Sequence, residues 1–227
     1  MIRARIALGV WFAICGWASP AFAQTADPAA FRLEAGIGLQ WDGRQPLGSR
    51  TATETTAAGS TRALFDTSSE LAGAAGLSGR IGVRLTHSLV AEAETSYLKP
   101  QLRIAISGDA EGAPAVTATE TVQQFTIGGG VLWYVPGRVW SPRFAPFAMA
   151  GAGYLRQLHE PATLVEAGRY YQFGAGVSAL LISGTHVHTT GAGVRADVRA
   201  LIRSRGVAFD GGSKTSPAAG VSAFVRF

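Results

Sequence analysis

Apolar and polar or small residues alternate strictly from Phe31 to Asp42. Odd positions carry the apolar side chains, and even positions carry charged, amide or glycine residues. A period of two is typical of a β-strand with one apolar and one polar face, because successive side chains point to opposite sides of the strand. The segment is also long enough for a tilted crossing of a bilayer, which needs roughly 9–11 residues. The pattern predicts a strand with one lipid-compatible and one polar face.

Seven further segments alternate in the same way, while helix signals are scarce and glycine is abundant, with 29 among 227 residues. The eight predicted strands cover residues 31–42, 76–85, 89–99, 119–135, 144–156, 170–181, 191–203 and 217–227. No apolar run of roughly 18 residues follows the N-terminal region, so a membrane-spanning helix is not expected there. The sequence predicts an all-β fold.

Residues 1–23 have the features of a secretory signal peptide: basic residues near the start, a short apolar stretch, and an Ala-Phe-Ala motif that ends at Ala23. We expect cleavage after Ala23, which leaves residues 24–227 as one barrel domain. Cys15 lies within the signal. The mature domain is therefore expected to have no disulfide or thiol chemistry.

The charge balance gives little reason to expect a nucleic-acid partner. The chain has 20 basic and 15 acidic residues, a formal net charge of +5. Removal of the two arginines in the signal leaves 18 against 15, or +3. So small an excess provides no electrostatic basis for nucleic-acid binding.

Alternation alone fits a soluble barrel or sandwich as well as a membrane barrel, and three features favour the membrane barrel. The polar face is rich in glycine, which leaves room for arginine in the narrow interior of an eight-stranded barrel. Longer and shorter connections alternate, as outer loops and periplasmic turns do. Aromatic residues of the apolar face lie near the predicted strand ends, as in membrane-interface girdles. They are Trp41, Tyr97 and Tyr171 at one end, and Phe31, Trp133, Phe144 and Phe227 at the other.

The pattern of the whole mature chain resembles the bacterial eight-stranded outer-membrane β-barrels, and is similar to the transmembrane domain of outer membrane protein A and to the opacity-type proteins. The tail adds to the resemblance, because Phe227 is aromatic and Val225, two residues before it, is apolar. The resemblance implies an eight-stranded antiparallel up-and-down transmembrane barrel in the outer membrane. It also implies contact with outer-membrane lipid, and recognition of Val225 and Phe227 by the barrel insertion machinery.

The predicted lumen face carries many charged residues, and we expect them to pair because unpaired charges in a narrow interior are costly. The predicted lumen charge network consists of Arg80, Arg84, Glu92, Glu94, Arg195, Asp197, Arg199 and Arg203, with Arg32, Glu34 and Arg226 on the same face. A network of this kind either fills the barrel or forms a selectivity or gating element that favours anions. A turn centred on His87 sets Arg80 opposite Glu94, which predicts an ion pair between them.

Other candidate sites are weaker. His186 and His188 lack a third metal ligand and the serine of a lipid-deacylase pair, so a plain turn is the preferred interpretation. Glycine patterns that resemble dinucleotide sites continue as alternating strands instead of helices. We therefore expect no metal, cofactor or catalytic residue. The segment from Arg44 to Ala75 is predicted to be a long outer loop, and an unidentified surface ligand could bind there.

The leading functional hypothesis is a small integral outer-membrane barrel with a structural or surface-interaction role and exposed loops. The alternative is a narrow channel for small, preferentially anionic solutes. A third hypothesis, an enzyme that modifies outer-membrane lipid, is disfavoured because the residues for its chemistry are missing. The sequence therefore predicts a barrel that is not an enzyme.

Overall fold

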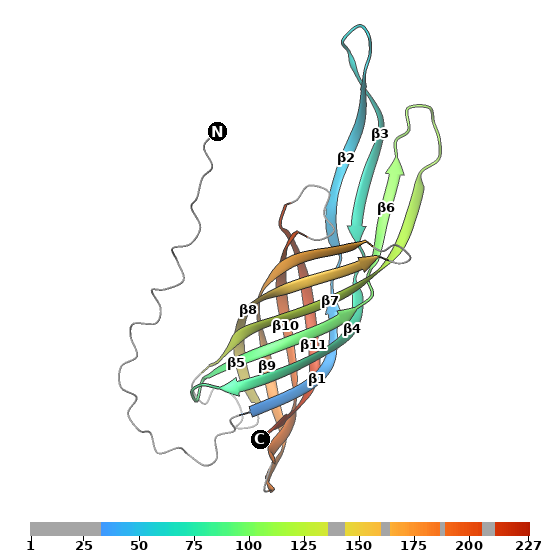
Figure 1. Ribbon diagram of the computed structural model, residues 1–227. Helices are drawn as coiled ribbons and strands as arrows, with labels where there is room; N and C mark the ends of the chain where they lie inside the picture. The colour runs from blue at the N-terminus through green and yellow to red at the C-terminus, as the bar shows by residue number, and fades with distance from the viewer. Residues whose placement is uncertain (1–32, 136–143, 160–163, 187–188, 206–211) are drawn as a thin grey trace, which may run out of the picture. The chain divides into compact units, whose positions relative to one another are not determined.

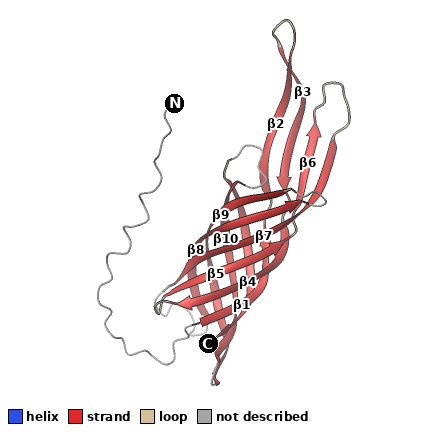
Figure 2. Cartoon of the chain, viewed as in Figure 1, coloured by secondary structure: helices blue, strands red, loops and turns tan. Residues whose placement is uncertain are grey.

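The computed structural model describes residues 33–135, 144–159, 164–186, 189–205 and 212–227, and their regular structure is entirely β-strand (Figure 1, Figure 2). The strands are β1 (Leu33–Asp42), β2 (Gln45–Thr55), β3 (Thr61–Leu71), β4 (Ala74–Arg84), β5 (Leu89–Leu98), β6 (Gln101–Ser107), β7 (Val116–Tyr134), β8 (Phe144–His159), β9 (Val165–His186), β10 (Thr189–Arg205) and β11 (Lys214–Arg226). Within these residues, no helix has the length and apolar character needed to cross a membrane.

Eight of the strands close into an antiparallel barrel, as predicted. Their order around the barrel is β1, β4, β5, β7, β8, β9, β10 and β11. Closure comes from β1 and β11, which pair from Glu34 opposite Arg226 to Asp42 opposite Ala218. We call the end of the barrel where β1 leads into β2 the upper end.

The alternation in the sequence becomes an inside and an outside of the barrel. Ile37, Ile127 and Val198 point outward and are 68%, 65% and 64% exposed. Inward-facing polar residues such as Glu34 and Asp197 are buried. The barrel therefore exposes an apolar outer surface and buries charged residues in its interior beside apolar ones, unlike a water-soluble domain.

The aromatic residues predicted to mark the strand ends mostly lie on this outer surface. Trp41 and Tyr171 at the upper end, and Trp133 and Phe144 at the lower end, are all exposed. Phe31 lies outside the described residues.

The prediction of a long loop from Arg44 to Ala75 is wrong. This segment forms the hairpin of β2 and β3. β6 pairs with β3 on one side and with the start of β7 on the other. We call the four-stranded sheet made of β2, β3, β6 and residues 116–121 of β7 the upper sheet; Figure 1 shows it continuing from the upper end of the barrel.

Local features of the sequence favour strands in the upper sheet. Threonines recur along β2, and β-branched residues suit extended strands. The hairpin turns through Gly59, whose φ of 80° favours glycine. However, the far part of β2 is exposed on both faces, so it has no apolar alternation for a sequence search to detect.

An apolar cluster joins the upper sheet to the barrel. Leu47, Leu71, Leu102 and Val122 are all buried, and they come from β2, β3, β6 and β7. Val122 also lies opposite His159 on β8. The cluster thus fixes the base of the upper sheet to the barrel rim.

We predict that two glycines on neighbouring strands respond differently to alanine. A Cβ at Gly38 would collide with the Val221 carbonyl oxygen and with Ser222 across the closing pair. A Cβ at Gly79, which faces outward, would meet nothing nearer than the Thr95 methyl group at 3.7 Å. Gly38→Ala should lower the free energy of unfolding by about 1–3 kcal/mol, as measured by urea titration of the refolded barrel. Gly79→Ala is the control, and equal loss in both variants would contradict the closure described above.

Candidate functional site in the barrel lumen

The candidate site is the set of charged side chains that the barrel strands point inward. They come mainly from β1, β4, β5 and β10, where every second residue faces the lumen. Seven of the eight residues predicted for the lumen charge network are buried. The seven are Arg80, Glu92, Glu94, Arg195, Asp197, Arg199 and Arg203.

Arg195 lies at the centre and is almost completely buried, with 1% of its surface exposed. Its Nη1 donates to Glu92 Oε2 at 2.6 Å, and its Nε is 3.5 Å from Asp197 Oδ1. Its guanidinium carbon is 4.4 Å from the centre of the Phe147 ring, a cation–π distance. Two carboxylates and an aromatic face thus compensate for the burial of one cation.

Arg199, four residues further along β10 toward the upper end, forms a second centre. Its Nη1 donates to Glu94 Oε1, and its Nε donates to Asp197 Oδ2, both at 2.6 Å. Gln172 accepts from the same Nη1 at 3.0 Å and donates to Glu94 at 3.3 Å. Asp197 therefore lies between Arg195 and Arg199 and joins the two centres.

The predicted register of the β4–β5 hairpin is confirmed, but the predicted ion pair is wrong. Arg80 does lie opposite Glu94. Its guanidinium nevertheless lies nearer Glu34 and Glu92, with nitrogen–oxygen distances of 3.7 and 3.8 Å. Glu94 pairs across the lumen with Arg199 instead. In so narrow a barrel a long side chain reaches strands far from its own, so register alone does not fix its partner.

The lower end of the lumen holds the remaining predicted charges. Arg226 Nε donates to Glu34 Oε2 at 2.9 Å, across the strands that close the barrel. Arg84 is half-buried and donates to the His87 carbonyl oxygen at 3.1 Å. Arg32 lies outside the described residues.

An amide-rich layer above the arginines was missed by the sequence analysis. Arg203 donates to Asp42 and, at 2.5 Å, to Gln45. Gln40 and Gln124 also donate to Asp42, at 2.7 and 3.2 Å. The signal was available, since Gln40 and Gln124 occupy polar-face positions of predicted strands, but a selection by charge passes over neutral amides.

Little free space remains between these side chains. Three cavities inside the barrel have volumes of about 10 Å³ each. That is roughly the volume one water molecule needs. Within the part of the chain that is described, charged and amide side chains occupy the lumen, and Arg80 Nε and Nη2 are among the few buried polar atoms without a hydrogen-bond partner.

The histidines do not form a recognisable metal centre. Among the described side chains, no three His, Cys, Asp or Glu residues are grouped to hold a metal. His159 is buried near the barrel rim, and its Nδ1 is 3.0 Å from Glu120 Oε1. His186 ends β9, and His188 lies outside the described residues.

The two residues predicted to act in insertion lie on the outer surface of β11 and just beyond it. Val225 is 36% exposed and Phe227 is 45% exposed. The Phe227 backbone exchanges hydrogen bonds with Leu33 at 2.8 and 3.4 Å, which joins it to β1. Their role in insertion stays a prediction.

Comparison with known proteins identifies the fold through solved structures. No protein-family model matches the chain, and no curated protein matches it by sequence. The outer membrane protein OprG of Pseudomonas aeruginosa matches with a TM-score of 0.53 and 9% identity, over 87% of this chain and 96% of that one. Neisserial surface protein A matches with a TM-score of 0.44 and 13% identity, over 85% of this chain and 95% of that one. The Ail protein of Yersinia pestis, solved with the heparin analogue sucrose octasulfate, matches with a TM-score of 0.42 and 10% identity, over 86% of this chain and 99% of that one.

The likeness to OprG supports the fold alone, because the sequence identity is so low. It agrees with the closed barrel of eight antiparallel strands found here. The chain has the fold of the eight-stranded outer-membrane barrels.

We predict that Arg195 stabilises the barrel more than any exposed arginine does. Arg195→Ala leaves Glu92 without its nearest partner in a buried site, so the free energy of unfolding should fall by about 3–5 kcal/mol. Urea unfolding followed by the shift in gel mobility of the folded barrel measures the loss. Arg62→Ala, on the exposed part of β3, is the control. Equal unfolding midpoints for the Arg195 variant and the parent protein would refute a paired lumen.

Proposed function

We propose that this protein is an integral outer-membrane barrel that presents the upper sheet to the medium, in a structural or surface-interaction role. The observation that carries the proposal is the upper sheet itself, an ordered structure built on a barrel whose lumen is filled. In this account the barrel is the anchor and the upper sheet is the part that meets partners.

The membrane location is supported by the outer surface of the barrel. Large apolar side chains cover it, and a soluble monomer rarely exposes so much apolar surface in one region. Closure satisfies the backbone hydrogen bonds of the barrel strands, which a hydrocarbon environment requires. The predicted signal peptide and cleavage after Ala23 agree with this location.

A role for the upper sheet is supported by its outer face. A shallow hollow of about 500 Å³ lies there between β2, β3, β6 and β7, among hydroxyl groups such as those of Ser49, Ser68 and Thr117. Glu70 lies beside it and pairs with Arg44 and Arg103, at 3.4 and 3.9 Å. Hydroxyls and an exposed charge cluster on a fixed sheet suit recognition of a polar ligand. The ligand is the unidentified surface partner predicted for this segment.

The other hypotheses receive less support. A channel for small anionic solutes would need a continuous path, whereas the cavities between the lumen side chains are of single-water size. The proposal includes no enzymatic step. Outer-membrane lipid and the barrel insertion machinery remain the other proposed partners.

Cysteine labelling on intact cells tests which end of the barrel faces the medium. The one cysteine of the chain, Cys15, lies in the predicted signal peptide, so after the predicted cleavage Ala58→Cys places a single thiol in the turn between β2 and β3. We predict rapid reaction with a membrane-impermeant maleimide. His87→Cys, in the turn between β4 and β5, is the matched control and should react only after the outer membrane is permeabilised.

The opposite pattern, with His87→Cys labelled on intact cells and Ala58→Cys protected, would contradict the proposed orientation. Equal labelling of both thiols in a soluble cell fraction would contradict the membrane location itself.

A further inference from the structure

Three barrel strands share a short pattern on their outer surface near the upper end. A tyrosine is followed, two residues further up on the same face, by a cationic side chain. The pairs are Tyr97 and Lys99 after β5, Tyr154 and Arg156 on β8, and Tyr171 and Arg169 on β9. β7, between β5 and β8, has Phe125 followed by Gln123. Tyrosine rings with cations just above them are typical of the boundary between hydrocarbon and headgroups.

Among the described barrel strands, only β5, β8 and β9 carry a cation at this step, and Arg44, one residue beyond Gly43, is paired with Glu70. At the corresponding level, the other four barrel strands carry uncharged residues. These are Ser204 on β10, Thr215 on β11, Gly43 after β1 and Gly73 before β4. A general preference for cations at a membrane boundary would place them around the whole circumference. The one-sided arrangement therefore indicates a localised site.

The register brings the two arginines together. Tyr154 lies opposite Arg169, and Arg156 lies two residues further along β8 on the same face. Diagonal neighbours of this kind lie roughly 7–8 Å apart, with their Cβ atoms somewhat closer. Among the described residues, no carboxylate forms an ion pair with either arginine. Both guanidinium groups are thus available to an anion from outside the chain.

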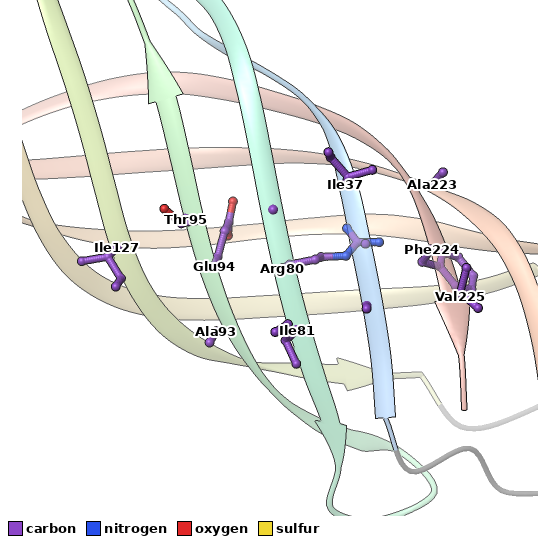
Figure 3. A pocket seen from close by; sticks show the side chains of 13 residues that line it. Ile37, Arg80, Ile81, Ala93, Glu94, Thr95, Ile127, Ala223, Phe224 and Val225 are labelled. Atoms are coloured by element: carbon purple, nitrogen blue, oxygen red, sulfur yellow. The ribbon is translucent and has the colours of Figure 1, made fainter. Parts of the chain in front are cut away.

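An apolar groove approaches the same place along the outer surface. Its volume is about 660 Å³, within the range of ligand pockets. One edge of it follows a single row of opposed residues, from Ala223 on β11 through Ile37 and Thr95 to Ile127 on β7 (Figure 3). The same row then continues to Tyr154 and Arg169.

The row climbs along the barrel in this direction. Ala223 is close to the lower end of β11, whereas Arg169 is close to the upper end of β9. Small residues such as Gly79 and Ala93 form the floor of the groove between larger apolar side chains. The groove thus leads from the lower apolar surface up toward the cations.

We propose that this surface binds a phosphate-bearing lipid of the outer leaflet, with an acyl chain in the groove and headgroup phosphate at Arg156 and Arg169. Arginine suits this role because its planar fork binds phosphate oxygens in pairs. Lys99, whose Nζ is 5.9 Å from the centre of the Tyr97 ring, adds a third positive charge. The inference rests on the proposed membrane location and orientation but is independent of any binding role for the upper sheet.

Native mass spectrometry of the refolded full-length mature protein in a neutral detergent tests the proposal. The probes are diphosphorylated lipid A and the same lipid after enzymatic removal of its phosphates. The double variant R156Q/R169Q is compared with R50Q/R62Q, which removes the same charge from exposed positions on β2 and β3. Arg156 and Arg169 should each contribute roughly tenfold to the affinity for the phosphorylated lipid.

Support requires that R156Q/R169Q weakens binding of phosphorylated lipid A about a hundredfold, a factor of ten for each arginine, while R50Q/R62Q binds as the parent does. Dephosphorylated lipid should bind the parent and R156Q/R169Q equally. Equal loss in both double variants, or no loss in either, would overturn the site. Insertion of all these proteins into vesicles of zwitterionic lipid is measured in parallel. Failure of the parent to insert would refute the membrane location, whereas normal insertion with unchanged lipid A binding would refute the lipid site alone.

Discussion

Closure of the sheet by β1 and β11 is the constraint on which the other features of the barrel depend. A strand inside hydrocarbon cannot leave its backbone hydrogen-bonding groups unpaired, so the sheet has to close. Closure with eight strands leaves an interior just wide enough for side chains. Gly38 shows how closely the closing strands approach each other, because even one added methyl group would collide with the neighbouring strand β11. The narrow interior then decides what the lumen can contain.

Charged side chains in so narrow a space have to pair with one another. Asp197 meets this requirement by joining Arg195 to Arg199, and Glu92 and Glu94 complete the two centres from β5. The amide layer above continues the same packing with neutral groups. As a result the described part of the barrel is filled from the buried cluster around Tyr134 and Phe147 at its lower end to the apolar cluster at its rim. A filled barrel agrees with the proposed role of an anchor for the upper sheet.

Much of this arrangement could be predicted from the sequence because a period of two is a local signal. The faces of the eight barrel strands and the register around His87 follow from alternation and turn length. The ion-pair partners of Arg80 could not be predicted from register alone. Side chains cross the lumen, so their partners depend on the curvature of the whole barrel. The upper sheet was missed because β3 pairs with β6, which is distant in sequence, and the far part of β2 is polar on both faces.

Conductance through a planar lipid bilayer tests the central claim, a membrane barrel with a filled lumen, most directly. The refolded mature protein should insert, as shown by protection of its strands from protease in vesicles, and yet give no stable conductance above the bare bilayer. The ion pairs around Arg195 would then hold the lumen closed in the membrane. Reproducible conductance steps from inserted parent protein, with a preference for anions, would contradict the filled lumen and favour a channel.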